Sequence, residues 1–503
     1  MKSLSTEIGA VYLGEGKCRF RTWAPFKKHL EVRLFSPVDR IVPMEREEKG
    51  YWCAEVNDVR PGSRYLIRLD GEIERPDPAS FYQPDGVHGQ SEVIDPRFES
   101  HDRNWAGIGL ADHIFYELHV GAFTPEGTFE GVIGKLDHIA ALGATSVEIM
   151  PVAQFPGEHN WGYDGGCLFA VQNSYGGPAG LRRLVDACHE KGLSVTLDVV
   201  YNHFGPEGTY LRDFGPYFTR KYITPWGEAV NFDDDYNQEV RNFFIQNALF
   251  WLDNYNIDAL RLDAVHAIYD RSAVPFLWQL AESVEELGKK SGRNRYLIAE
   301  SDLNDSRLIR PRKVWGYQLD SQWCDDFHHC LHTLLTGERG GYYRDFGKLS
   351  DLTTSLREGY LYSGRYSKFR KRNHGNHSAD LASEKFVVAS QNHDQVGNRM
   401  LGERLSTLIS FEAQKLAAAV VLLSPFLPLL FMGEEYGEQA PFLYFVDHTD
   451  PELREAVRKG RREEFNGFIW QGEPPDPASM ETFLKSRLDW SKVGGSRQHS
   501  LLS

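Results

Sequence analysis

After residue 113 the sequence alternates short apolar runs with amphipathic helical segments, and this alternation constrains the fold more than any other feature. The pattern is typical of βα units in a parallel sheet. Helical patterns lie at 132–142, 180–192 and 239–256, among other places. The apolar runs, expected as strands, number eight: residues 113–120, 145–152, 194–200, 259–265, 295–301, 318–326, 385–392 and 428–435. Eight such units predict an α/β fold with a closed (β/α)8 barrel, the TIM-barrel architecture, and long insertions.

The first 95 residues have a different pattern. Their apolar runs are rich in aromatic and β-branched residues, and Gly, Pro and Asp separate them: residues 18–25, 30–37, 51–56 and 63–69. These runs predict a small immunoglobulin-like β-sandwich over 1–95. The Pro- and Asp-rich stretch at 75–105 is interpreted as a linker. The barrel is expected over 96–470, followed by a C-terminal extension over 471–503.

The overall charge and the apolar segments limit the classes of partner. The chain has 503 residues and a formal net charge of −15. An acidic surface repels phosphate backbones, so we expect no nucleic-acid partner. Residues 416–432 are almost wholly apolar, but Ser424, Pro425 and Pro428 interrupt them. They predict a buried helix followed by a buried strand, and therefore no membrane partner.

The cysteines and the N-terminal residues bear on the cellular compartment. The six cysteines are scattered, with neither a CxxC pair nor a zinc-like spacing. Scattered thiols are typical of a reducing compartment, and the N-terminal residues lack the apolar stretch of a signal peptide. These features predict a cytoplasmic protein without a metal site, since no dedicated cluster of oxygen ligands is visible either. Nothing in the sequence predicts an oligomeric state.

Polar side chains lie at the carboxyl ends of four of the predicted barrel strands or just after them, where barrel enzymes place their chemistry. These residues are Asp198 with Asn202 and His203, Arg261 with Asp263, Glu300, and Asn392 with His393 and Asp394. Arg261 and Asp263 are two apart on a strand, so they share a face, and the guanidinium keeps the carboxylate ionised. Glu300 follows an apolar strand, which raises the pKa of a carboxyl and suits it to donate a proton.

Each of these residues has a structural alternative. A single Asp after a strand is most often a helix cap or a turn former, and His203 and His393 could be core histidines. Carboxylates at four strand ends together favour a catalytic site over caps. Trp161 and Tyr163 support this interpretation, because they lie in a glycine-rich loop at 159–166 and aromatic rings stack on the apolar faces of sugars.

Four segments resemble the signature motifs of the α-amylase superfamily in order and in spacing. They are DVVYNHFG at 198–205, RLDAV at 261–265, AES at 299–301 and QNHD at 391–394. The resemblance implies that Asp263 is the nucleophile and Glu300 the acid/base, while Asp394 holds and distorts the reacting sugar. It also implies a supporting set: Arg261 orienting Asp263, Asp198 behind Arg261, His203 and His393 on the sugar hydroxyls, and Tyr163 beneath the ring. Trp161 and Asn392 are expected in the same cleft.

Longer segments resemble the maltooligosyltrehalose trehalohydrolase family, namely residues 322–347, 364–375, 393–399 and 431–465. Enzymes of this family cleave the α-1,4 bond next to the terminal trehalose unit and release free trehalose. The resemblance implies an α-glucan oligosaccharide substrate, maltooligosyltrehalose, retention of configuration and no cofactor. The chain departs from ordinary α-amylases at Ala267, where many of them carry a histidine.

Three other functions are compatible with parts of the sequence. A glucan branching enzyme would use the same carboxylates, but the segments 322–347 and 431–465 argue against it. A general α-amylase-type hydrolase would also use them, and Ala267 argues against that specificity. An inactive glucan-binding protein would not need the complete set Arg261, Asp263, Glu300 and Asp394.

Two further expectations concern the acceptor side and the C-terminus. Asp325, Asp326 and His329 follow the sixth predicted strand and are outside the superfamily's shared chemistry. We expect this loop, and Asp326 in particular, to shape the acceptor side of the cleft, with helix capping as the alternative. The small C-terminal β-domain that is usual in the family is expected to be absent, because the sequence ends at Ser503.

Overall fold

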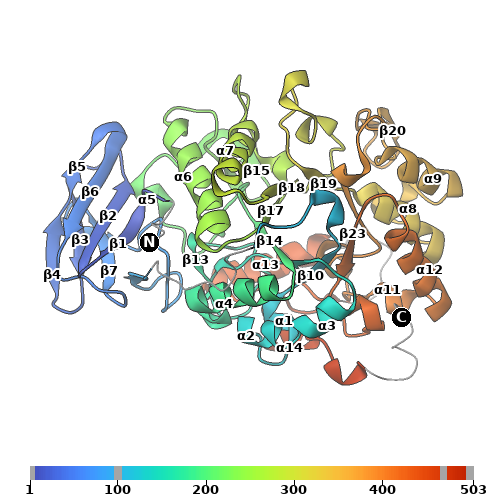
Figure 1. The fold of residues 1–503 in the computed structure, drawn as a ribbon, viewed down its shortest axis with the longest axis horizontal. Helices are drawn as coiled ribbons and strands as arrows, with labels where there is room; N and C mark the ends of the chain where they lie inside the picture. The colour runs from blue at the N-terminus through green and yellow to red at the C-terminus, as the bar shows by residue number, and fades with distance from the viewer. Residues whose placement is uncertain (1–5, 96–104, 465–472, 494–503) are drawn as a thin grey trace.

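The computed structural model describes residues 6–95, 105–464 and 473–493. In the described part of the chain, eight parallel strands close into a central barrel (Figure 1). In order around the barrel they are β10 (Phe115–Leu118), β11 (Ser146–Ile149), β14 (Ser194–Val199), β17 (Ala259–Leu262), β18 (Tyr296–Ala299), β19 (Ser321–Trp323), β22 (Phe386–Ala389) and β23 (Leu427–Phe431). β23 pairs back onto β10. The predicted (β/α)8 barrel is confirmed, and each predicted strand supplies one barrel strand.

The barrel strands are buried because helices cover them outside and side chains fill the barrel inside. Every residue of β10, β11, β14 and β17 is buried, as expected for parallel strands covered on both faces. The longer helices around the barrel are α4 (Gly177–Glu190), α6 (Asn237–Leu249), α7 (Phe276–Ser291), α8 (Asp325–Thr336), α9 (Leu349–Glu358), α12 (Phe411–Leu422) and α13 (Pro451–Glu464). α4 buries Leu181, Leu184, Val185 and Cys188, an i, i+3, i+4, i+7 stripe that faces the sheet.

Two of the helices predicted from the sequence differ in the structure, one in its continuity and one in its burial. The helix at 132–142 is divided into α2 (Phe129–Ile133) and α3 (Leu136–Ala141), because Gly134 caps α2. The expectation that residues 416–432 begin with a buried helix was wrong. α12 buries only Ala417, Ala418 and Val421, whereas Leu423 just beyond it is 84% exposed. Among the described residues, no helix is long and apolar enough to cross a membrane.

The N-terminal residues form two antiparallel sheets that lie beside one end of the barrel (Figure 1). The first contains β1 (Gly9–Gly14), β2 (Lys17–Trp23), β6 (Tyr51–Val56) and β5 (Glu45–Arg46), and the second β4 (Arg40–Pro43), β3 (Leu30–Leu34), β7 (Arg64–Leu69), β8 (Ile73–Arg75) and β9 (Ser91–Glu92). The buried rings of Phe20 and Tyr65, one from each sheet, meet edge to face at 4.9 Å. The two sheets therefore share one core.

The interpretation of 75–105 as a linker needs correction. β9 pairs with β7, and Phe81 is buried and stacks on Phe250 beside the barrel at 5.0 Å. The segment is irregular but packed, because its apolar residues fill the junction between the N-terminal sheets and the barrel. Residues 96–104, the remainder of the proposed linker, lie outside the described residues.

The remaining elements lie on the loops or near the C-terminus. The β-ribbons are β12 (Ala153–Gln154) with β13 (Cys167–Val171), β15 (Phe218–Thr224) with β16 (Gly227–Val230), and β20 (Arg365–Ser367) with β21 (Arg372–His374). The short helices are α1 (Val120–Phe123), α5 (Leu211–Phe214), α10 (His393–Gly397), α11 (Leu405–Leu408) and α14 (Met480–Lys485). The segment with α14 packs on the barrel, since Trp490 donates its Nε1–H to the carbonyl of Phe123.

Candidate active site at the mouth of the barrel

One buried arginine connects the carboxyl ends of neighbouring barrel strands. Arg261 of β17 has no exposed surface, and its Nη1 donates to both oxygens of Asp198, at 3.0 and 2.8 Å. The same nitrogen donates to Asp263 Oδ1 at 2.8 Å, and Nη2 lies 3.8 Å from Glu300 Oε2. The guanidinium also lies over the Trp323 ring, 4.3 Å from its centroid. The three acidic side chains and the ring are therefore positioned by one cation.

Asp263 is held by a donor on each oxygen. Arg261 donates to Oδ1, and the Asn202 amide donates to Oδ2 at 3.1 Å. Ala264 follows in the left-handed region, with φ 39°, and its backbone N–H donates to Glu300 Oε2 at 2.6 Å. Non-glycine residues in this region are uncommon and cluster at functional sites. The turn after β17 thus orients both Asp263 and Glu300.

The acidic groups around Arg261 differ in their electrostatics. Burial raises the pKa of Glu300, with Asp263 and Asp394 adding to the effect and Arg261 opposing it. Glu300 therefore keeps its proton to a higher pH than an ordinary glutamate, which is the property of a general acid. Burial also raises the pKa of Asp198 to about 7, although Arg261 lowers it.

Tyr163 and His393 form the neighbouring wall. The Tyr163 hydroxyl donates to Asp198 Oδ2 at 2.6 Å and lies 2.7 Å from His393 Nε2. The two rings stack, with centroids 5.3 Å apart. Asp394, the next residue, has a side chain that is 39% exposed, while the side chain of His393 is 1% exposed. A direct hydrogen bond from His393 to a sugar stays a prediction, since the structure shows it supporting Tyr163.

Three of the residues that are predicted to contact substrate also make contacts within the protein. Trp161 is 4% exposed; its ring stacks on Phe442 and its Nε1–H donates to the Leu443 carbonyl, so it packs behind His393. Asn392 caps α10, because its side-chain oxygen accepts the Gln395 N–H. His203 bonds through both ring nitrogens, to Asn202 and to the Tyr163 carbonyl. These side chains position their neighbours, and their contacts with a sugar stay predictions.

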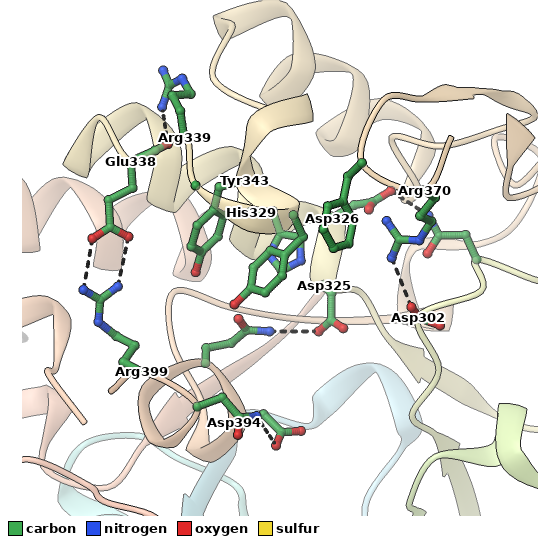
Figure 2. Close-up of a pocket in the computed structure, with 16 residues that line it drawn as sticks. Asp302, Asp325, Asp326, His329, Glu338, Arg339, Tyr343, Arg370, Asp394 and Arg399 are labelled. Atoms are coloured by element: carbon green, nitrogen blue, oxygen red, sulfur yellow. Dashed lines mark hydrogen bonds and ion pairs between the residues drawn. The ribbon is translucent and has the colours of Figure 1, made fainter. Parts of the chain in front are cut away.

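A cavity of about 630 Å³ opens beside Asp394. Asp394, Asp325 and the rings of Tyr342 and Phe369 line it. Burial raises the pKa of Asp325 well above its usual range, with Glu300 and Asp394 adding to the effect. Two ion pairs flank the cavity on opposite sides (Figure 2): Glu338 with Arg399, and Asp302 with Arg370. The cavity thus combines aromatic faces with charged edges.

Asp326 lines the cavity but is buried, and one of its carboxylate oxygens accepts several hydrogen bonds. Its Oδ2 accepts hydrogen bonds from the Asn304 amide and from the backbone N–H groups of Leu361 and Tyr362, at 2.6, 2.7 and 2.9 Å. It therefore holds the loops around the cavity, and its role on the acceptor side stays a prediction. His329 also lines the cavity, stacked on Tyr342.

Sequence reasoning missed several residues of the site. Glu117 and Glu148 lie in the middle of apolar strands, where a buried carboxyl is unexpected and could have been noticed. Trp226, on the β15–β16 ribbon, is half exposed and stacks on His203 at 4.4 Å. No local pattern marks Trp226 as a site residue, because its position depends on how the ribbon folds over the barrel.

The comparisons agree with this geometry. The model of the α-amylase catalytic domain family matches residues 78–222. The malto-oligosyltrehalose trehalohydrolase of Saccharolobus solfataricus is 51% identical over 95% of this chain and 83% of its own length. The enzyme of that name from Arthrobacter ramosus is 46% identical, over 94% and 83%.

A solved structure agrees as well. The crystal structure of a Salmonella typhimurium protein assigned as an α-amylase has a TM-score of 0.91 and 40% identity. The match covers 99% of this chain and 84% of that one. With relatives at this identity over most of both sequences, the chain belongs to the malto-oligosyltrehalose trehalohydrolase family of the α-amylase superfamily.

Proposed function

We propose that this protein hydrolyses the α-1,4 bond next to the terminal trehalose unit of maltooligosyltrehalose and releases free trehalose with retention of configuration. The observation that carries the proposal is the pairing of Asp263 and Glu300 on Arg261, beside a cavity that is open next to Asp394. The names of the relatives supply the substrate class.

The chemistry assigns one role to each carboxyl. The ionised Asp263 attacks the anomeric carbon, while Glu300 donates its proton to the departing glycosidic oxygen, which leaves as a trehalose hydroxyl. Glu300, now a carboxylate, takes a proton from water, and the resulting hydroxide displaces Asp263 from the same carbon. Two inversions at one centre retain the α configuration. Asp394 accepts hydrogen bonds from the hydroxyls of the reacting sugar, whose apolar face rests on Tyr163.

The cavity is the proposed site for the trehalose unit. Its volume of about 630 Å³ lies within the range of small-molecule sites. The rings of Tyr342 and Phe369 can stack on sugar faces, and Arg370 can donate to hydroxyls.

We assign the catalytic domain to 96–470, after the N-terminal sandwich at 1–95 and before an extension at 471–503. A cytoplasmic location is proposed from the six cysteines, all of which are free thiols.

A product analysis tests the substrate. The protein is incubated with maltooligosyltrehalose and, separately, with maltooligosaccharides of equal length, and the products are separated by chromatography. We expect free trehalose from the first and much slower cleavage of the second. Equal rates would favour a general α-amylase, and branched products would favour a branching enzyme; a GlgB branching enzyme of Bacillus caldolyticus is 28% identical over 84% of this chain.

Small nucleophiles test the roles of the carboxyls, because any single loss lowers the rate by several powers of ten. In Asp263→Gly, azide should attack from the vacated side and give the β-glycosyl azide. In Glu300→Ala, azide should intercept the glycosyl-enzyme and give the α-glycosyl azide from an activated substrate. Asp394→Ala should give neither the β- nor the α-glycosyl azide. An α product with Asp263→Gly would contradict the assignment.

A further inference from the structure

A buried carboxylate in the middle of β10 binds one residue of the site twice. Glu117 Oε2 accepts the backbone N–H of His393 at 3.0 Å, and Oε1 lies 2.5 Å from His393 Nδ1. Both side chains are 1% exposed. Glu117 therefore fixes the backbone and the ring of His393 together, from inside the barrel.

The hydrogen bonds around His393 determine where its protons are. The Tyr163 hydroxyl donates its single proton to Asp198, whose two oxygens also accept from Arg261. The Tyr163 oxygen must then accept from His393 Nε2, which is 2.7 Å away. On the other side of the ring, Nδ1 faces the Glu117 carboxylate, which only accepts. Both ring nitrogens are thus donors, and a histidine with two N–H groups is an imidazolium.

The surrounding charges agree with a doubly protonated His393. Burial lowers the pKa of His393, but Asp394, whose Oδ1 lies 3.5 Å from Nε2, and Glu117 outweigh it and raise the pKa to about 9, against Arg261. The other titratable groups that face the ring or its partners are Glu148 on β11, His119 after β10, Asp198 on β14 and Tyr163. Burial raises the pKa of Glu148 well above its usual range and lowers that of His119 to about 4.

We propose that Glu117 is a positioning residue, which holds His393 as a fixed imidazolium against Tyr163 and Asp394 at the wall of the cleft. Glu117 does not touch the sugar. It acts by setting the charge and the orientation of His393, and through that ring the placement of the Tyr163 platform and of the Asp394 carboxylate.

The substitution Glu117→Gln tests the proposal. The new amide oxygen can still accept the backbone N–H, but the amide NH₂ must donate to Nδ1, which favours neutral His393. In protein labelled with ¹⁵N-histidine, with His393→Gln to identify the signal, we expect wild-type His393 to be doubly protonated at pH 7.5. In Glu117→Gln, His393 should lose its second ring proton at a pH at least one unit lower than in the wild type. We also expect the kcat/KM of the variant for trehalose release, relative to wild type, to fall at least tenfold between pH 5.5 and 8.

The neighbouring strand provides a matched control. Glu148 pairs with Glu117 in the register of β10 and β11 and is equally buried. Within the described part of the chain, neither of its oxygens has a hydrogen-bond partner. Burial, with Glu117 adding, raises the pKa of Glu148 well above its usual range, which favours the neutral form that Glu148→Gln mimics. We expect the kcat/KM of Glu148→Gln, relative to wild type, to stay constant between pH 5.5 and 8.

The outcomes separate a charge effect from a structural one. Glu117→Asp retains the carboxylate at a shorter reach, so it should keep the titration of His393 near the wild-type value even if the rate falls. A neutral His393 in the wild type at pH 7.5 would overturn the proposal, as would an unchanged titration in Glu117→Gln. If Glu117→Gln does not fold, the titration of His393 in the wild type and in Glu117→Asp tests the proposal. The activity readout rests on the proposed function; a wild type that releases no trehalose would refute that function and leave the NMR result valid.

Discussion

Replacing Asp326 by alanine should loosen the loops around the cavity beside Asp394. Asp326 lies in the first turn of α8, and its Oδ2 accepts from the Asn304 amide and from the backbone N–H groups of Leu361 and Tyr362. All three donors are on loops that are distant from α8 in sequence. The alanine variant leaves the donors without an acceptor in a buried position.

The size of the effect follows from the number of donors. A buried donor that loses its partner costs about 1–3 kcal/mol, so the two backbone N–H groups alone predict a loss of about 2–6 kcal/mol in the free energy of unfolding. The chain that follows Tyr362 carries Phe369 and Arg370 to the cavity wall. We therefore expect KM for maltooligosyltrehalose to rise by about tenfold, the equivalent of about 1.4 kcal/mol of binding.

Urea unfolding and paired kinetics on the two substrates measure these effects. Asp326→Asn is the control, because an amide oxygen in the place of Oδ2 can still accept all three bonds, and it should lose clearly less stability than Asp326→Ala. An alanine variant as stable as the wild type would refute the hydrogen-bond reasoning. A well-folded alanine variant with an unchanged ratio of rates on maltooligosyltrehalose and plain maltooligosaccharides would leave the loop without a role in specificity.

Two further predictions concern the catalytic face. In Gly397→Ala, the new Cβ would lie 2.1 Å from the Trp161 ring that backs His393, so kcat should fall at least tenfold in steady-state assays. Gly460→Ala in α13, where a Cβ meets nothing within 4 Å, should retain wild-type kcat, and equal kcat in both variants would contradict the packing argument. Because Glu300 must be protonated to act as the acid and burial raises its pKa, kcat/KM should fall as pH rises through that raised pKa. A pH profile whose alkaline limb is unchanged in Asp394→Asn would count against this, since the Asp394 charge helps to raise the pKa of Glu300.

Much of the fold follows from local sequence patterns. The eight barrel strands could be located because each is a short apolar run, and helical patterns lie between several of them. Arg261, Asp263 and Glu300 could be named because each lies at the carboxyl end of a strand or directly after it, and parallel strands bring their carboxyl ends to one face. That these residues lie close together could therefore be predicted without knowing how the side chains pack.

Only the tertiary structure decided what the other side chains contact. Trp161 looked like a sugar platform from its glycine-rich loop, but it packs against Phe442, more than 270 residues later in the sequence. Glu117 could not be connected with His393, because their hydrogen bonds span 276 residues and form only when β10 and β22 take their places in the closed barrel. Local periodicity shows that a position is buried, whereas the partner of a buried polar group depends on which distant elements the closed sheet brings together.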